Sequence, residues 1–344
     1  MSEPLPTDPD AALAEGARLL RAGRYAEAEA AFRDAAAERP HQALHNLGVL
    51  YRSTGDLAAA ETAFRQALEN SPNPAVTEFS LGMLLMSLGR WAEGWPFYEA
   101  RETVLRLWRP EGPAQRWDGQ PLAGRTLAVV GEQGLGDQLQ FVRYMRGLDG
   151  PAAVVCGQPL ARLFEANGIR PLPAAAASHA DAWCFLLSLP RLTRRPDPIW
   201  HGPYLSARAS GGGGVGLVTR GDPNNRNDAN RSLPQPLAHR LAAETGALSL
   251  HPQDTGARDF QDTAEIVAGL DLVITVDTSV AHLAGAMGRP VWILLPHVGL
   301  DWRWLHERAD TPWYPSARLY RQPRPGDWTS VVDRLLADFR REQV

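Results

Sequence analysis

A polar turn follows a predicted buried strand near residue 277. In the segment DLVITVDTSVAHLAGAMGRPVWILLP, from Asp271 to Pro296, an apolar strand ends at Val276, and an Ala- and Gly-rich helix follows the turn. Ligands of open parallel sheets bind at the carboxyl ends of the strands, where the free N–H groups of the next helix favour anions. A diphosphate would suit this place.

Four side chains of this turn and helix are candidates for contact with such a ligand. Asp277 would accept from ligand hydroxyls or fix the loop, Thr278 would donate a hydrogen bond, and Ser279 would cap the helix. His282 lies about one helical turn after Ser279 and can point toward the same pocket. Structural roles stay open for each residue alone, because Asp and Ser are common helix caps.

A glycine loop, GEQGLGD at residues 131–137, follows another predicted strand and leads into a helix. Gly134 and Gly136 let the backbone turn tightly and approach a ligand. The spacing GxxGxG is neither the dinucleotide fingerprint nor a P-loop. Asp137 would lie at the mouth of a crevice, where a carboxylate can take the proton of a hydroxyl. Its alternative role is helix capping.

A third polar segment, TRGDPNNRNDANRSLP at residues 219–234, carries Arg220, Arg226 and Arg231. Arginine pairs well with diphosphate oxygens and can neutralise a leaving diphosphate. The alternative is a solvated polar loop. We expect no metal site, because the predicted α/β region contains no DxD motif to hold a divalent ion.

Helical repeats precede these motifs. Gly23, Gly55 and Gly89 each stand between two apolar helical patterns. A small residue follows each glycine after five positions and an aromatic residue after nine, and the first two units end in proline: Ala28, Ala60, Gly94; Phe32, Phe64, Tyr98; Pro40, Pro72. This period resembles the tetratricopeptide repeat, with about three copies. A plain helical bundle is the alternative.

The remaining chain alternates apolar strand-like runs with amphipathic helices, which favours parallel sheets covered by helices. We expect an α fold followed by an α/β fold with two Rossmann-like lobes. The predicted parts are tetratricopeptide-like repeats at 11–105, a connector at 106–124, lobes at 125–210 and 215–326 around a run of four glycines, and a final helix at 327–344.

Composition excludes several partners. The chain of 344 residues has a formal net charge of −4, which does not attract nucleic acid. Cys156 and Cys184 form no CxxC motif, and no apolar run is long enough for a transmembrane segment. The N-terminal residues lack the pattern of a signal peptide. We therefore expect a cytoplasmic protein without a cofactor.

Four motifs in order, EQGLGDQLQFVRY, RGDPNNRNDANRS, VDTSVAHLAGAMGRPVW and DWRWLHERADTPWYP, resemble the heptosyltransferase-like glycosyltransferases of family 9. The arrangement is also similar to that of protein O-GlcNAc transferases. The resemblance implies two lobes of GT-B type and an inverting, metal-independent transfer from a nucleotide-diphosphate sugar. It implies Asp137 as the base. Asp277, Thr278, Ser279 and His282 would contact the donor.

Three hypotheses for function follow. In the first, the repeats capture a polypeptide such as flagellin or another surface protein, and Asp137 activates its Ser or Thr hydroxyl. In the second, the acceptor is a glycan or a lipid-linked sugar. In the third, the lobes are a degenerate scaffold. Thr219 and Asp222 depart from the aromatic residue and the Asn usual in the family, and the first lobe is short.

Overall fold

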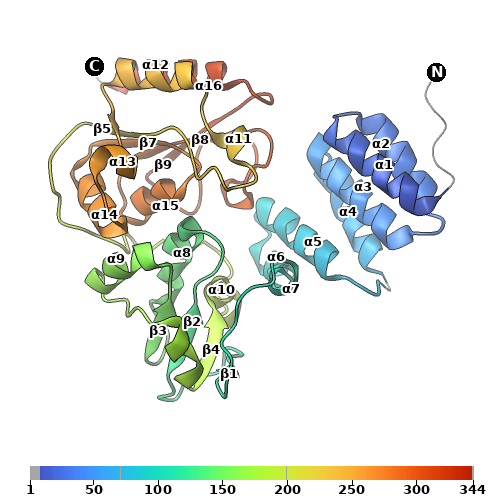
Figure 1. Ribbon diagram of the computed structural model, residues 1–344, viewed down its shortest axis with the longest axis horizontal. Helices are drawn as coiled ribbons and strands as arrows, with labels where there is room; N and C mark the ends of the chain where they lie inside the picture. Colours follow the sequence, from blue (N-terminus) through green and yellow to red (C-terminus); the bar gives the residue numbers. More distant parts are fainter. Residues whose placement is uncertain (1–7, 70, 199, 343–344) are drawn as a thin grey trace. The chain divides into compact units, whose positions relative to one another are not determined.

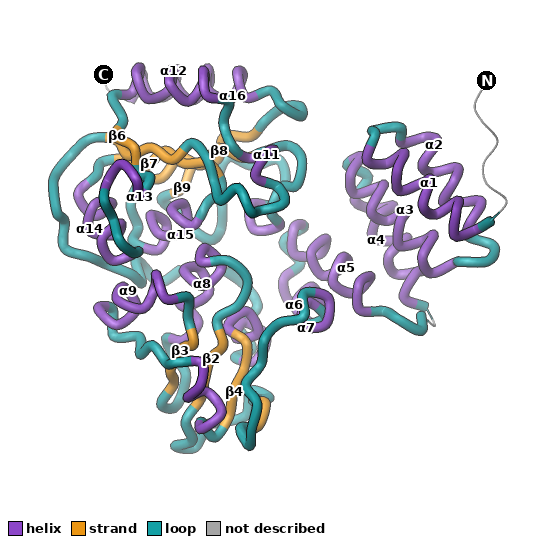
Figure 2. Tube along the Cα trace, in the orientation of Figure 1, coloured by secondary structure: helices purple, strands orange, loops and turns teal. Residues whose placement is uncertain are grey.

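The structure is a computed structural model that describes residues 8–69, 71–198 and 200–342 (Figures 1 and 2). The chain divides into two compact units, and the division falls after Leu107. The first unit is helical and the second is built on two parallel sheets. The expected fold class, α followed by α/β, is confirmed.

Helices of the first unit pack as successive hairpins, α1 on α2, α3 on α4 and α5 on α6. The turns contain Gly23, Gly55 and Gly89, whose φ angles of 73°, 85° and 75° lie in the left-handed region that glycine adopts freely. The helices are α1 Pro9–Arg21, α2 Tyr25–Ala35, α3 Pro40–Thr54, α4 Leu57–Leu68, α5 Ala75–Ser87, α6 Trp91–Tyr98 and α7 Arg101–Val104.

A second set of glycines, not singled out in the sequence, lets these hairpins close. A Cβ atom on Gly16 would lie 2.5 Å from the Phe32 ring, and one on Gly48 would lie 2.6 Å from the Phe64 ring. Both rings are fully buried. The aromatic residue of each hairpin therefore lies against a helix that carries no side chain at the contact.

The first lobe of the second unit contains a parallel sheet in the order β1-β4-β2-β3. Its strands are β1 Gln115–Arg116, β2 Leu127–Val130, β3 Ala152–Val155 and β4 Ala182–Phe185. Its helices are α8 Leu135–Phe141, α9 Ala161–Ala166 and α10 Leu189–Leu192, with 3-10 turns η1 Val142–Met145, η2 Gln158–Leu160, η3 Ala174–His179 and η4 Leu186–Ser188.

The second lobe contains a parallel sheet in the order β6-β5-β7-β8-β9. Its strands are β5 Val215–Val218, β6 Leu248–Ser249, β7 Leu272–Val276, β8 Val291–Leu295 and β9 Ala317–Arg321. Its helices are α11 Asp228–Arg231, α12 Gln235–Thr245, α13 Pro252–Thr255, α14 Phe260–Gly269, α15 Ser279–Ala286 and α16 Trp328–Glu342, with the 3-10 turn η5 Trp302–Trp304. None of the helices in the described residues is long and apolar enough to cross a membrane.

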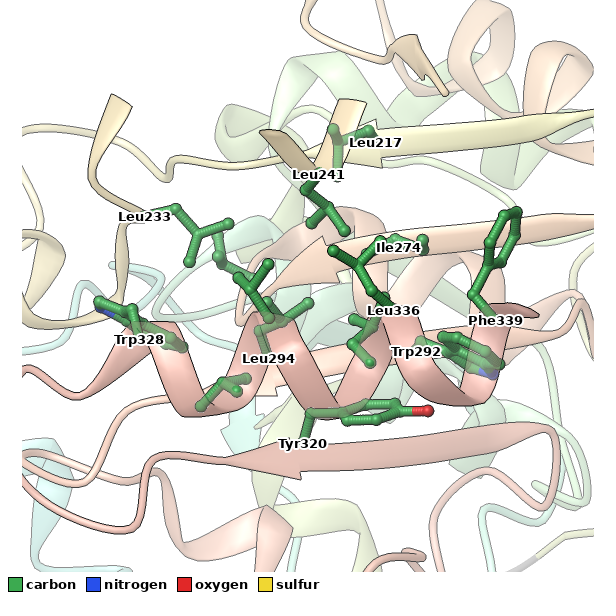
Figure 3. Packing of buried hydrophobic residues seen from close by; sticks show 14 of the residues in the cluster. Leu217, Leu233, Leu241, Ile274, Trp292, Leu294, Tyr320, Trp328, Leu336 and Phe339 are labelled. Carbon is green, nitrogen blue, oxygen red and sulfur yellow. The ribbon is translucent and has the colours of Figure 1, made fainter. Parts of the chain in front are cut away.

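Helices α12 and α16 cover one face of the second sheet, and α14 and α15 lie on its other side (Figure 1). Helix α16 is strongly amphipathic, so its apolar stripe faces the sheet. Figure 3 shows Leu336 and Phe339 of α16 beside Trp292 of β8 and Ile274 of β7. Burial of this large apolar surface attaches the C-terminal helix to the lobe that contains the polar turn at residue 277.

The sheet edges are short or covered. Strands β1 and β6, at one edge of each sheet, have two residues each. At the opposite edges, the Val154 N–H of β3 donates to Arg170, and the Leu319 N–H of β9 donates to Ala309. Loop backbone therefore occupies edge positions beside both longer outer strands.

Two strands were not expected from the sequence. Strand β1 lies within the predicted connector at 106–124, and β9 lies in a stretch to which no strand was assigned. The sequence of β9 is ARLYR, and its arginines interrupt the run of apolar residues that would predict a buried strand. The Arg318 guanidinium pairs with Asp338 of α16, so the side chain is held at the surface while Leu319 and Tyr320 are buried.

The helix that the sequence predicts after the glycine loop is short. It begins at Leu135, ends at Phe141 and continues as the 3-10 turn Val142–Met145. Gly147, with φ of 103°, ends the turn. The tighter turn holds Arg143, which is buried and donates to the Trp313 carbonyl and the Tyr204 hydroxyl.

Candidate active site

Helices α8 and α15, each of which follows the carboxyl end of a central strand, pack against each other between the two sheets (Figure 1). The contact is close at Gly136, where an added Cβ atom would lie 2.7 Å from Cδ2 of His282 and 3.4 Å from Cα of Ser279. The glycine loop and the polar turn, 140 residues apart in sequence, thus meet at the facing edges of the lobes.

Asp137 lies in the first turn of α8, and both of its carboxylate oxygens have partners. Oδ2 accepts from the backbone N–H of Gly134 at 2.8 Å, and Oδ1 pairs with Nη2 of Arg303. Burial raises the pKa of Asp137, and the Arg303 charge opposes this rise. The capping role left open by the sequence is present, together with a partner from the other lobe.

Arg303 was not singled out in the sequence, although it lies in the DWRWL run. Its side chain is 3% exposed. Nη1 pairs with Asp301 at 2.9 Å, Nε donates to the Gln140 side chain, and the guanidinium lies 4.4 Å from the Trp302 ring centroid. A buried guanidinium needs such partners because the loss of hydration is costly. The residue therefore joins Asp137 and Gln140 of α8 to the second lobe.

Asp277 has an unusual electrostatic environment. Burial, together with the neighbouring Asp301 carboxylate, raises the pKa of Asp277 to about 7, although Arg231 and Arg303 act in the opposite direction. Its backbone carbonyl accepts from Nη1 of Arg231 at 2.8 Å. At neutral pH a substantial fraction of Asp277 is therefore protonated and can donate as well as accept a hydrogen bond.

Thr278, rather than Ser279, occupies the N-cap position of α15, which corrects the expected cap. The Thr278 side chain makes no capping bond, because its hydroxyl lies 3.1 Å from that of Thr275. Ser279 is the first residue of the helix. The N–H groups of the first turn of α15 therefore receive no hydrogen bond from the N-cap side chain.

His282 is buried and enclosed by neighbouring residues. Its Nδ1 lies 3.0 Å from the Tyr314 hydroxyl, its ring stacks on Trp304 with centroids 5.4 Å apart, and Gly136 covers it. Burial lowers the pKa of His282 well below its usual value, so the ring is neutral at neutral pH. These contacts favour a structural role at the junction of the lobes.

The three arginines of residues 219–234 differ in their surroundings. Arg231 is anchored, with an ion pair to Asp228 at 3.0 Å, and its guanidinium occupies the space where Gly221 would carry a Cβ atom. Arg220 is exposed, and its charge helps lower the pKa of His251, after burial of that ring. Arg226 is exposed. Arg231 thus lies next to the polar turn.

Within the described residues, no group of three or more His, Cys, Asp and Glu side chains is arranged to hold a metal ion. Where α8 packs against α15, charged side chains of the two lobes form a network. It contains Asp137, Asp301 and Arg303, and Asp277, Asp228 and Arg231 lie beside it. Such an arrangement places two ion-paired guanidinium groups next to a carboxylate that can accept a proton.

Two protein families match parts of the chain. The family described as tetratricopeptide repeat matches residues 13–74, and the one described as glycosyltransferase family 9 (heptosyltransferase) matches residues 254–294. One part of the chain is thus similar to tetratricopeptide repeats, and another part is similar to a family of glycosyltransferases. The second match includes β7 and α15, and so covers Asp277, Thr278, Ser279 and His282 but not Asp137.

A curated relative and a solved structure are also similar to the chain. Protein FlbA of Caulobacter vibrioides is 26% identical over 367 residues, which cover 87% of this chain and 61% of FlbA. The chain thus spans less than two thirds of that relative. A mutant of Thermobaculum terrenum O-GlcNAc transferase is 16% identical, covering 97% of this chain and 92% of the other, with a TM-score of 0.27. That TM-score is too low to support an inference.

Proposed function

We propose that the chain transfers a sugar from a nucleotide-diphosphate sugar to a hydroxyl of a polypeptide that the repeats capture. One observation carries this proposal. The turn and helix that match glycosyltransferase family 9 pack directly against the first turn of α8, which presents Asp137. In this proposal, the donor site and the carboxylate that accepts the proton therefore lie next to each other.

The donor diphosphate would bind at the start of α15. Uncapped N–H groups of the first turn and the helix dipole favour an anion there. Arg231, which pairs with Asp228 and donates to the Asp277 carbonyl, supplies a guanidinium beside it. A partly protonated Asp277 donates a hydrogen bond to a phosphate or sugar oxygen without adding a full negative charge.

In the proposed inverting step, the acceptor oxygen bonds to the anomeric carbon while the bond from that carbon to the diphosphate breaks. The acceptor proton passes to Asp137, and the electron pair leaves with the diphosphate. A carboxylate offers about four lone-pair positions, and Gly134 and Arg303 use two of those on Asp137. Capacity for the transferred proton remains, and Arg231 stabilises the leaving charge in place of a metal ion.

Donor binding is tested by calorimetry with UDP, GDP, CDP and ADP on the folded protein. At least one should bind, and failure of all four would contradict the proposal. Asp137→Asn should then lower transfer at least about 100-fold while nucleotide binding stays unchanged. Asp118→Asn, which alters an exposed carboxyl of the same lobe, is the control and should transfer at the wild-type rate.

The acceptor is tested separately. Transfer is measured to polypeptides rich in Ser and Thr, flagellin among them, and to free or lipid-linked glycans, with the labelled sugar of whichever donor binds. Labelling of polypeptide alone supports the proposal. Labelling of glycans alone would show a different acceptor, and nucleotide binding without transfer to either class would indicate a scaffold.

A further inference from the structure

The carboxylate of Asp137 is reached by a guanidinium that comes from the other lobe. Arg303 is 166 positions away in sequence and pairs with Oδ1. The other charged groups that influence Asp137 are Asp301 and Glu132, both negative, while the backbone N–H of Gly134 acts with Arg303. His282, which lies over Gly136, is neutral because burial lowers its pKa.

Arg303 is itself held in place from several sides. Asp301 binds Nη1 with both oxygens, at 3.0 and 2.9 Å, and Gln140 accepts from Nε. The rings of Trp302 and Phe141 lie 4.4 and 5.5 Å from the guanidinium carbon. A planar group held by both oxygens of one carboxylate and by aromatic faces has few other orientations. Its remaining donor edge points at Asp137.

We propose that Arg303 is a positioning residue for Asp137: it holds the carboxylate at the start of α8 in one orientation and in the charged form that accepts a proton. This role rests on the proposed function, in which Asp137 is the base. A cation at this distance favours the ionised form of a carboxyl that burial alone would keep protonated. Arg303 acts through Asp137 and need not touch the acceptor.

The sign of the effect follows from the charges. Burial, with Asp301 and Glu132, raises the pKa of Asp137, and Arg303 lowers it. Removal of the guanidinium therefore raises this pKa further. More of the carboxyl is then protonated at neutral pH, and the acid limb of the kcat/KM profile moves to higher pH.

The kinetic test compares kcat/KM from pH 5 to 10 for the wild type and three variants of the full chain. Arg303→Gln should shift the acid limb upward by about 1–3 pH units, with partial recovery at high pH. Arg303→Lys keeps the charge and should shift the limb less. Arg318→Gln breaks the ion pair with Asp338 of α16, which does not involve Asp137, and should leave the pH profile unchanged. An unshifted limb in Arg303→Gln would overturn the inference.

A measurement without turnover separates this inference from the proposed function. The side-chain carboxyl of Asp137 is followed by 13C NMR, assigned by its loss in Asp137→Asn. In the wild type it should be ionised at pH 7, and its pKa should rise in Arg303→Gln. A wild-type carboxyl protonated at pH 7 overturns the inference even where variants do not fold. The expected titration in a protein that transfers no sugar would reject the proposed function and leave the Arg303–Asp137 coupling in place.

Discussion

At the scale of single residues, polar groups that look alike in the sequence have different surroundings where α8 packs against α15. Asp137 and Asp277 both lie where a strand is followed by a helix. Asp137 is ion-paired with Arg303, whereas the neighbouring charge that most affects Asp277 is the like charge of Asp301. Burial raises the pKa of both carboxyl groups, and the direct ion pair with Arg303 opposes that rise at Asp137. Asp137 would accept a proton, and Asp277 would hold one.

The protonated state of Asp277 has a consequence for stability. Its pKa is raised to about 7 in the folded chain, while the unfolded value is about 3.9. Its contribution to the free energy of unfolding is therefore present below pH 4 and is lost as the pH rises through 7. Asp277→Asn removes this titration. Between pH 4 and pH 8 the free energy of unfolding should fall for both proteins. The fall should be smaller for the variant than for the wild type, by on the order of 2 kcal/mol.

Urea unfolding at a series of pH values from 4 to 8 measures this difference. The exposed Asp118→Asn is the matched control, and its stability should follow the wild-type curve. Parallel curves for Asp277→Asn and the wild type would show that the Asp277 carboxyl is ionised in the folded chain at pH 7.

At the scale of elements, the contact of α8 with α15 depends on a residue without a side chain. Gly136 allows the two helices to approach, and a methyl group there would meet the His282 ring at 2.7 Å. The ring cannot easily move away, because Trp304 and Tyr314 enclose it. The glycine predicted as part of a ligand loop therefore acts in packing between the lobes.

Gly136→Ala should destabilise the chain by about 1–3 kcal/mol, because it overpacks this contact. In an open helix the same change would stabilise by about 0.5–1 kcal/mol. Thermal unfolding of the variant measures the difference. Gly211→Ala, where no atom lies within 4 Å of the added carbon, is the control and should change little. A Gly136→Ala variant of raised stability would show that the helices have room to separate.

The elements could be predicted where the pattern is local. Strands β2, β7 and β8 are continuous apolar runs, and the hairpin turns carry their glycines at a fixed period. Strand β9 could not be predicted, since Arg318, which interrupts its apolar residues, is paired with Asp338 of α16. The candidate site likewise has local features that the sequence predicts and long-range contacts that it does not. The Asp137 cap is local, whereas its pairing with Arg303 depends on contact between lobes.

At the scale of the whole molecule, the candidate chemistry and the repeats are in different compact units. All of the network around Asp137, Arg303 and Asp277 belongs to the unit that begins at Trp108, and the repeats belong to the unit that ends at Leu107. Solenoid repeats usually provide a concave surface for a partner chain. Deletion of the repeats can therefore separate the proposed capture of the acceptor from the proposed transfer of the sugar.

A chain that begins at Trp108 should bind the same nucleotide diphosphate as the full chain, since the proposed donor site lies wholly within it. Its transfer to polypeptide should fall at least about tenfold, because the linked capture site is lost. Calorimetry and transfer assays give the two values, after circular dichroism has shown that the shortened chain is folded. Polypeptide transfer at the full rate would contradict a capturing role for the repeats.

The outer strands of the two sheets affect the tendency of the protein to aggregate at high concentration. A long, bare outer strand offers N–H and C=O groups to another chain and is a common start of aggregation. In the described residues, the outer strands are either two residues long, as in β1 and β6, or hydrogen-bonded to a flanking loop, as in β3 and β9. Neither lobe therefore presents an easy template for strand addition, which favours colloidal stability in a chain built on two separate sheets.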